Sequence, residues 1–171
     1  MGKRSNFERN PRDFYRTPAS AARPLIAELH RQDVDTFCEP CAGDGTLIHH
    51  LHEFYCIEAH DIEPQAPGID QKDALTITST EADVIITNPP WSRFVLHPLL
   101  EHFVNIAPTW LLLDAGWMFT RQASPYLRWC KKIIAVGRVK WIPDSPYTSK
   151  DDCAWYLFDK NKTGDTIFIG R

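Results

Sequence analysis

The chain has 171 residues, a length that fits one domain with a substantial hydrophobic core. Hydrophobic residues make up 43% of it and charged residues 24%, which excludes a disordered or fibrous protein. No apolar run approaches the ~18 residues of a membrane span, and residues 1–14 lack the apolar core of a secretory signal. Five cysteines without such a signal favour reduced thiols, so we expect a cytoplasmic protein.

The net charge of −3 hides an uneven distribution. Residues 1–23 sum to +4, residues 24–120 to −12 and residues 121–150 to +6. An acidic middle between two basic segments is compatible with a polyanionic partner that meets part of the surface. Solvated helix faces and a mobile arm would give the same pattern, so charge alone leaves both interpretations open.

Along the chain, residues 1–13 are expected to form a basic arm and residues 14–171 a single domain. A helix is predicted over residues 18–31, with Thr17 as its N-cap and a kink or break at Pro24. The remaining predicted helices are 46–54, 96–106 and 124–130, and the predicted strands are 33–38, 55–62, 82–87, 110–114, 133–136, 154–158 and 167–169.

Strands alternate with helices in this prediction, and the inner strands are continuous apolar runs. That combination is typical of an α/β fold, a doubly wound, mostly parallel Rossmann-like sheet with helices on both faces. Ligands bind such sheets at the carboxyl ends of the strands, so the segments that follow each strand are the candidate sites.

The stretch Glu39–Gly45 (EPCAGDG) follows the first predicted strand and opens a helix. Gly43 and Gly45 allow a tight turn and close approach of the backbone to a ligand. The Lys-Ser/Thr of a phosphate-binding P-loop is absent, and Glu39 and Asp44 would repel phosphate. The loop therefore suits a cationic ligand, although a plain strand-to-helix turn is the alternative.

Two further acids come near the ends of later strands. Asp61 ends the second predicted strand, about 18 residues beyond the glycine loop, where an acid in an α/β sheet typically binds a ribose diol. Asp73 is expected at the end of the strand that follows. Each alone could be a solvated loop residue, but their order after successive strands indicates a ligand site.

The tetrapeptide Asn88-Pro89-Pro90-Trp91 directly follows the strand 82–87 and is the most specific motif. The Asn88 side chain and the Pro89 carbonyl offer two acceptors, and Trp91 offers a flat face for stacking. Two acceptors beside an aromatic ring suit a planar amide or a nucleobase that carries an exocyclic amino group. A strand-terminating turn with a buried Trp is the alternative.

Cysteine and histidine give no comparable signal. The pair Cys38 and Cys41 lacks a second pair at zinc-finger spacing, and the glycines after it do not fit a redox motif. Three histidines at 49, 50 and 52 splay around one helix, so metal binding there is a minority interpretation. We therefore expect no metal site, and no Ser–His–Asp or Cys–His pattern is evident.

In this order, these motifs resemble the S-adenosylmethionine-dependent N6-adenine methyltransferases, in particular the small DNA adenine methylases of phages. Asp13–Pro18 (DFYRTP) resembles their N-terminal cofactor-binding segment, and residues 137–158 resemble the end of the phage enzymes. The resemblance covers most of residues 13–158, and Cys41-Ala42 departs from the usual loop pattern. It implies S-adenosylmethionine as cofactor, S-adenosylhomocysteine as product and no metal.

The resemblance also assigns roles to residues. It places Glu39 or Asp44 near the cofactor's ammonium, Asp61 on its ribose and Asp73 on its adenine. The catalytic residues it implies are Asn88, Pro89, Pro90 and Trp91, which would bind the target amino group and stack on the target base. The cofactor-binding residues it implies are Tyr15, Thr17, Pro18, Glu39, Pro40, Ala42, Gly43, Asp44, Gly45, Asp61, Ile62, Asp73, Ala74 and Asn88.

DNA is the expected substrate, and the basic segments favour nucleic acid over protein. RNA adenine and the glutamine amide of a protein also present a planar amino group and remain alternatives, as does a non-catalytic cofactor-binding module. With no room for a separate target-recognition domain, we expect short or relaxed sequence specificity. The residues expected to contact phosphate are Arg93, Arg121, Arg128, Lys131, Lys132, Arg138, Lys140 and Lys150.

Overall fold

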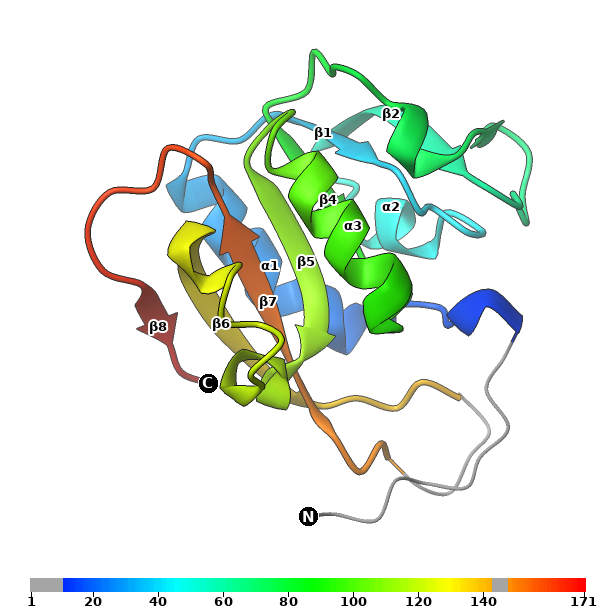
Figure 1. Cartoon of the computed structure of the whole chain (residues 1–171). Coiled ribbons are helices and arrows are strands. Elements are labelled where there is room, and N and C mark those ends of the chain that lie inside the picture. The colour runs from blue at the N-terminus through cyan, green and yellow to red at the C-terminus, as the bar shows by residue number, and fades with distance from the viewer. Residues whose placement is uncertain (1–10, 143–147) are drawn as a thin grey trace.

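The computed structural model describes residues 11–142 and 148–171, so most of the predicted basic arm lies outside the described residues. The described chain forms an eight-stranded sheet in the order β3-β2-β1-β4-β5-β7-β6-β8 (Figure 1). All neighbouring strands are parallel except β7, which runs antiparallel to β5 and β6. The strands are β1 (Thr36–Glu39), β2 (Tyr55–Asp61), β3 (Asp70–Gln71), β4 (Val84–Thr87), β5 (Thr109–Asp114), β6 (Cys130–Arg138), β7 (Asp152–Phe158) and β8 (Ile167–Ile169).

Helices cover both faces of the sheet, as predicted. The helices α1 (Ala19–Arg31) and α2 (Thr46–His50) pack on one face over a core that includes Phe37, Trp110 and Trp155. The helix α3 (Arg93–Phe103) packs on the other face over a core that includes Leu111 and Tyr156 (Figure 1). Because both faces are covered, inner strands such as β4 and β5 are buried along nearly their whole length. The predicted doubly wound, mostly parallel α/β fold is confirmed.

The predicted N-cap of α1 is wrong, and the break that was one alternative at Pro24 is absent. Pro18, not Thr17, occupies the N-cap position, because the Thr17 side chain turns toward Asn88 instead. The helix runs from Ala19 through Pro24 to Arg31 without interruption. Burial of one face of α1 against the sheet stabilises the helix despite the amide that proline lacks.

The predicted helix over residues 124–130 is also wrong. Only one 3-10 turn forms there, η4 (Leu127–Trp129), and β6 begins at Cys130, earlier than predicted. So short a helix is marginal without packing, whereas β6 gains backbone hydrogen bonds from β7 on one side and β8 on the other. The predicted helix 46–54 likewise shortens to α2.

The strand directions define two edges of the sheet. The carboxyl edge is where β1, β2, β4 and β5 end, and the amino edge is where they begin. Since β7 is antiparallel to both β5 and β6, β6 runs in the same direction as β5. Arg138 therefore lies at the carboxyl edge and Cys130 at the amino edge. No helix among the described residues is long and apolar enough to cross a membrane.

Candidate active site

A cavity of about 650 Å³ opens at the carboxyl edge of the sheet. The segment before α1 and the loops after β1, β2, β3 and β4 line it, so it lies where the α/β topology predicts a ligand. Of the predicted cofactor residues, the cavity brings together Tyr15, Thr17, Glu39, Pro40, Ala42, Gly43, Asp44, Asp61, Ile62, Asp73, Ala74 and Asn88. Pro18 and Gly45 do not line it.

The glycine loop ties β1 to β2 and needs glycine at residue 43. Gly43 has φ +57°, and a Cβ atom there would lie 2.4 Å from the ring of Phe14. The Gly43 amide donates to Asp61 Oδ2 at 2.7 Å, and the Ala42 amide donates to the carbonyl oxygen of His60 at 2.8 Å. The loop is thereby held against the end of β2, with its acids on the cavity wall.

Glu39 is the most unusual acid of this wall. Its residue is only 2% exposed, and its Oε2 atom has no hydrogen-bond partner. Burial, reinforced by the nearby Asp61 and Asp44 carboxylates, raises the pKa of Glu39 well above its usual value. A carboxyl group in this state gains most from a ligand that brings a positive charge and donor hydrogens.

Asp44 is in the opposite state. Its carboxylate accepts hydrogen bonds from the Thr46 amide and hydroxyl, and it pairs with Arg16. Burial acts to raise the pKa of Asp44, but these hydrogen bonds outweigh it and hold the pKa below its usual value. Of the two acids expected near a cofactor ammonium, Glu39 is therefore the one with an unpartnered oxygen.

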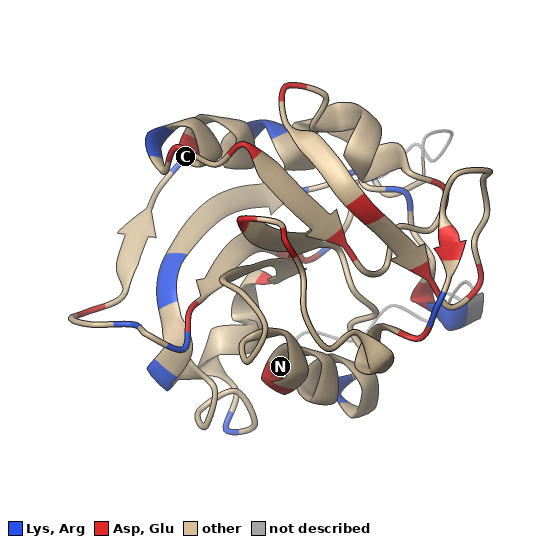
Figure 2. Ribbon diagram, turned by 90° about the horizontal axis from the view of Figure 1, so that it is seen from above, with Lys and Arg blue, Asp and Glu red and all other residues tan. Residues whose placement is uncertain are grey.

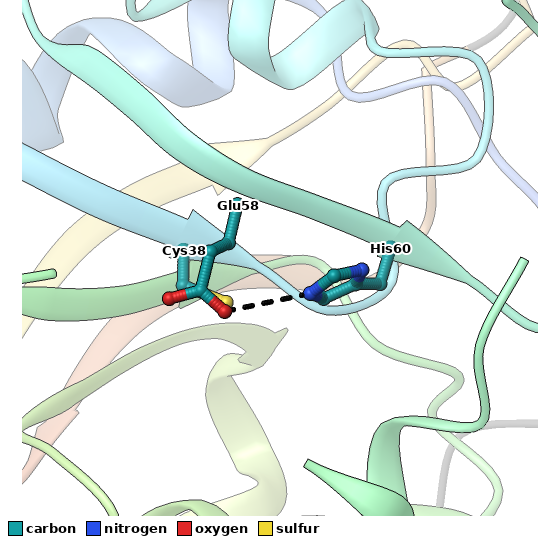
Figure 3. Close-up of side chains that lie close together, drawn as sticks. All are labelled: Cys38, Glu58 and His60. Atoms are coloured by element: carbon teal, nitrogen blue, oxygen red, sulfur yellow. Dashed lines mark ion pairs between the residues drawn. The ribbon is translucent and has the colours of Figure 1, made fainter. Parts of the chain in front are cut away.

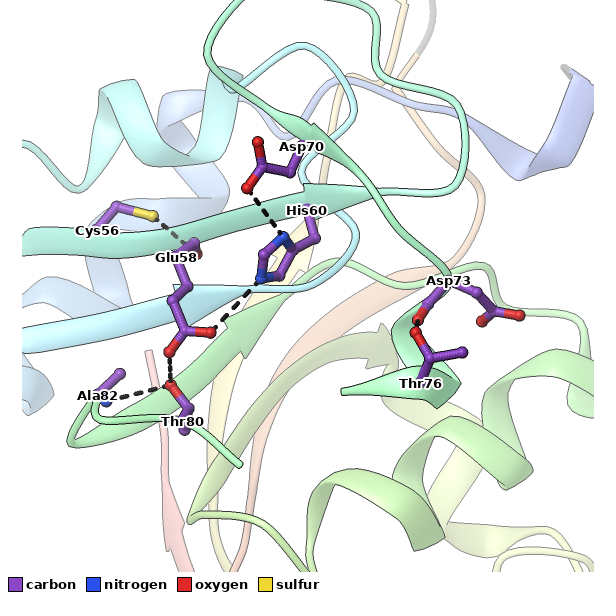
Figure 4. Close-up of polar contacts among 8 residues, drawn as sticks. All are labelled: Cys56, Glu58, His60, Asp70, Asp73, Thr76, Thr80 and Ala82. Carbon is purple, nitrogen blue, oxygen red and sulfur yellow. Dashed lines mark hydrogen bonds and ion pairs between the residues drawn. The ribbon is translucent and has the colours of Figure 1, made fainter. Parts of the chain in front are cut away.

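Asp61 and Asp73 also line the cavity. Asp61 Oδ1 accepts from the Glu63 amide at 2.8 Å, in addition to the Gly43 amide on Oδ2. Asp73 lies two residues beyond the short β3 and caps the 3-10 turn η2 (Ala74–Thr76), where its Oδ1 accepts from the Leu75 amide at 2.9 Å. Its backbone carbonyl oxygen accepts from the Thr76 hydroxyl (Figure 4). Each carboxylate keeps acceptor capacity beyond these bonds, which suits hydroxyl or amino donors.

Asn88 follows β4 and projects into the same cavity. Its Nδ2 atom donates to Thr17 Oγ1 at 3.1 Å and to the Tyr15 carbonyl oxygen at 3.5 Å. Because a backbone carbonyl can only accept, this contact fixes which end of the amide faces the N-terminal segment. The Asn88 carbonyl oxygen is then the end available to accept a hydrogen bond from a ligand.

The other three residues of the tetrapeptide do not all lie at the cavity. Pro90 lines the cavity, whereas Pro89 and Trp91 do not. Trp91 Nε1 donates to the Leu112 carbonyl oxygen of β5 at 2.9 Å, and its ring meets Trp141 edge-on with ring centroids 5.6 Å apart. The indole is thus anchored to the sheet rather than free at the cavity wall.

One aromatic residue that lines the cavity was not predicted from the sequence, although Tyr15 was. Phe94, in the first turn of α3, is 80% exposed and lines the cavity. The predicted helix begins at residue 96, whereas α3 begins at Arg93, so the prediction places Phe94 in a loop. Phe14 and Arg16 also line the cavity, and their one signal was the motif Asp13–Pro18 in which they lie.

Lys and Arg residues are spread over several elements of the molecule (Figure 2). The eight basic residues predicted to meet phosphate are divided between the two edges of the sheet and the connection between β5 and β6. At the amino edge, Lys132 pairs with Glu28, Lys131 pairs with Asp159, and the Arg128 guanidinium lies 4.4 Å from the ring centre of Trp129. At the carboxyl edge, Arg93 begins α3, Arg138 ends β6, and Lys140 and Lys150 lie between β6 and β7. Arg121 lies in the connection from β5 to β6.

No protein-family model and no curated protein matches the sequence. The structure is similar to a proposed RNA methyltransferase from Pyrococcus horikoshii, with a TM-score of 0.64 and 19% identity over 88% of this chain and 90% of that one. It is also similar to the methyltransferase subunit of a type I restriction-modification system from Streptococcus thermophilus (TM-score 0.62, 15% identity, 91% of this chain). The match spans 47% of that subunit.

A third similar structure is a proposed class I S-adenosylmethionine-dependent methyltransferase from Listeria monocytogenes. Its TM-score is 0.60, with 10% identity over 90% of this chain and 65% of that one. The strand order 3-2-1-4-5-7-6, with β7 antiparallel, is the order typical of this class. The chain therefore has the Rossmann-like fold of the class I methyltransferases.

Proposed function

We propose that this protein transfers the methyl group of S-adenosylmethionine to the N6 amino group of adenine in DNA. The observation that carries the proposal is the orientation of Asn88, whose amide nitrogen is held by Thr17 and Tyr15 and whose oxygen remains for a ligand. An acceptor fixed at the end of β4 is what a planar exocyclic amino group requires.

The residues of the cavity fit the cofactor. The unpartnered oxygen of buried Glu39 would bind the ammonium of its methionine part, Asp61 its ribose hydroxyls and Asp73 its adenine amino group. The cavity volume of about 650 Å³ lies within the range of small-molecule sites. When bound, the cofactor supplies an activated methyl group on its sulfonium.

The chain's own residues would then position the target. The lone pair of the adenine amino nitrogen is delocalised into the ring, which makes that nitrogen a weak nucleophile. A hydrogen bond from the amino group to the Asn88 side-chain oxygen would favour a more pyramidal nitrogen and align it for in-line displacement. In this proposal catalysis comes from positioning and electrostatics, without a covalent intermediate on the protein.

In duplex DNA the target base must leave the stack, which costs a few kcal/mol. The exposed ring of Phe94 at the cavity wall is placed to repay part of this cost by stacking, while Trp91 would support the tetrapeptide from the sheet. The basic residues at the carboxyl edge, among them Arg93, Arg138 and Lys140, would contact phosphate. Similarity to a proposed RNA methyltransferase and to a restriction-modification subunit supports a nucleic acid substrate.

The test is transfer of a labelled methyl group to duplex DNA, single-stranded DNA, RNA and protein in parallel, with nucleoside analysis of the product. Asn88→Ala should lower transfer about 100- to 1,000-fold, because it removes an acceptor that acts on the reacting nitrogen. Asn105→Ala is the matched control, since that side chain contacts Glu101 and Lys160 far from the cavity.

Unchanged transfer by the Asn88→Ala variant would contradict the proposal. Methylation of RNA or protein alone would replace the proposed substrate while leaving the cofactor assignment intact. Sequencing of the methylated DNA tests the prediction of short or relaxed sequence specificity, and a long, strict recognition site would contradict it.

A further inference from the structure

Three metal-ligating side chains meet on the α3 face of the sheet, next to the cofactor cavity but not part of its lining (Figure 3). They are Cys38 from β1 and Glu58 and His60 from β2, and their ligand atoms all lie within 4.8 Å of one another. His60 Nε2 lies 3.5 Å from Glu58 Oε2. Ligand atoms around a tetrahedral Zn²⁺ are about 3.3–3.7 Å apart, so the site needs little movement to close on an ion.

A β-bulge brings the three side chains together. Phe37 pairs with Cys56, but the next residue, Cys38, pairs with Glu58, so Ile57 is an extra residue in β2. Without it, strand alternation would place Ile57 beside Cys38 and send Glu58 to the other face. Bulges between parallel strands are rare, which indicates that this register is a specific feature of the fold.

The hydrogen bonding of His60 independently indicates that this cluster binds a ligand. The residue is only 6% exposed, yet neither ring nitrogen has a hydrogen-bond partner. Its Nε2 atom points at Glu58 and Cys38, as Figure 3 shows. Its contacts with Glu58 and Asp70, at 3.5 and 3.8 Å, are too long for good hydrogen bonds. A buried imidazole without hydrogen bonds costs free energy, and a metal ion would give Nε2 a closer partner.

Asp70 occupies the position of an orienting carboxylate. It pairs with His60 in the β2–β3 register, and its Oδ2 atom lies 3.8 Å from His60 Nδ1, on the side of the ring opposite Glu58 (Figure 4). A metal-bound histidine almost always gives its second N–H to a carboxylate or carbonyl group, which fixes the tautomer. Asp70 on β3, His60 on β2 and an ion beside Cys38 on β1 would therefore follow the order carboxylate, imidazole, metal.

We propose that Cys38, Glu58 and His60 bind one Zn²⁺ ion. A thiolate, a carboxylate and an imidazole are ligands that zinc prefers, and the two negative charges neutralise the ion in a buried setting. Cys38 releases its thiol proton to solvent on binding. The Glu58 side chain is 26% exposed, so the ion would enter the site from its side. A water molecule would complete the fourth coordination position.

The ion would act on the shape of the neighbouring cavity. His60 directly precedes Asp61, and its carbonyl oxygen accepts the Ala42 amide of the glycine loop. Zinc would fix the end of β2 and hold Asp61 and the loop in place. This role does not depend on which substrate the protein methylates, or on methylation at all.

The test is titration of the purified, metal-free chain with Co²⁺ as a spectroscopic stand-in for zinc, followed by displacement with Zn²⁺. We expect one ion per chain and a thiolate-to-cobalt charge-transfer band that zinc abolishes. His49→Gln and His52→Gln in the background remove exposed imidazoles on and beside α2 that could bind metal on their own.

Three variants separate the site from general damage to the fold. Cys38→Ser, which nearly conserves volume, should remove the charge-transfer band, whereas Cys130→Ser alters an equally buried thiol on β6 and should keep it. Asp70→Asn, at a side chain that is 85% exposed, should leave the fold and the band intact and lower zinc affinity about 10- to 100-fold. Absence of the band in the unmodified site, or equal loss in the Cys130→Ser variant, would overturn the proposal.

Discussion

Two carboxylates at opposite edges of the sheet are in opposite states. At the amino edge, Asp83 accepts hydrogen bonds from the amides of Asp35 and Thr36 and from the Thr36 hydroxyl, at 2.8–3.0 Å. These bonds, led by the one from the Thr36 amide, hold the pKa of Asp83 below its usual value. At the carboxyl edge, Glu39 is buried with one oxygen unpartnered, and its pKa is raised.

This difference separates carboxylates that stabilise the fold from carboxylates that are available to bind a ligand. A paired acid contributes to stability in the protein alone, whereas a buried, unpaired acid costs stability until something binds it. Shifted pKa values occur in both places, so the direction of the shift is more informative than its presence. The comparison predicts that substitutions at the two edges change different measurable quantities.

Within this comparison, the largest effect is expected at Glu39. Glu39→Gln keeps the shape of the side chain but removes the charge that would meet the cofactor's ammonium, so we expect the affinity for S-adenosylhomocysteine to fall about 100-fold. Stability of the ligand-free protein should stay the same or rise, because a poorly solvated acid is gone. Isothermal titration and urea unfolding measure the two quantities.

Asp83→Asn is the matched control for this prediction. It should leave cofactor affinity unchanged and lower stability, the reverse of the Glu39 result. Equal cofactor affinity of the Glu39→Gln variant and the unaltered protein would show that the buried acid serves the fold alone.

The next largest effect is expected at the amino edge, where Lys132 pairs with Glu28. The Glu28 side chain is only 2% exposed, and Arg31 and Gln32 also donate to it. Lys132→Met leaves this carboxylate with fewer partners and should lower the free energy of unfolding by about 2 kcal/mol, less than for a buried pair with no other donors. Unfolding in urea measures the loss.

A second substitution tests the reason for that loss. Replacing both partners, Glu28→Met with Lys132→Met, should recover most of the stability, because no charge is then left buried. Failure to recover would mean that packing of the Lys132 side chain, rather than the ion pair, matters at this edge.

The sequence predicted the parts of this molecule that depend on local pattern. The alternation of elements predicted the α/β sheet, and the motifs after β1 and β4 predicted residues that line one cavity, such as Glu39, Gly43 and Asn88. The conformation of residues 124–130 could not be predicted from the sequence, because it depends on the pairing of β6 with β7 and β8.

Side-chain contacts between distant segments could not be predicted from the sequence either. In the sequence, Cys38 is half of a Cys38–Cys41 pair. The bulge that places it beside Glu58 and His60 is a property of strand register, which the sequence pattern does not show. The anchoring of Trp91 to β5 depends on a backbone carbonyl 21 residues away. Sequence pattern shows which residues follow a strand, but not which way their side chains turn.

The third prediction concerns pH. The raised pKa of Glu39 means that the ligand-free protein keeps this group protonated above its usual pKa of 4.5. A cation binds only the ionised form well, so cofactor affinity should rise with pH up to the raised pKa, by as much as about tenfold per pH unit, and then level off. Titrations at several pH values, below the range where the ligand's own amino group loses its proton, measure this.

Stability should change with the opposite sign. A raised pKa favours the protonated folded state, so the contribution of Glu39 is present at low pH and is lost as pH rises through the folded pKa. The lowered pKa of Asp83 contributes stability that is lost as pH falls instead. Glu39→Gln should flatten the pH dependence of cofactor affinity, and an unaltered slope would assign that dependence to another group.

The smallest effect is expected at Lys131, whose side chain is about half exposed and lies 3.3 Å from Asp159. Exposed ion pairs are screened by solvent, so Lys131→Ala should lower the free energy of unfolding by no more than about 0.5 kcal/mol. It should also leave DNA binding and its salt dependence unchanged, because the residue lies at the amino edge, away from the cavity. Arg138→Ala, at the carboxyl edge, should lower the salt slope of binding by about 1. Equal losses in the two variants would mean that nucleic acid reaches both edges of the sheet.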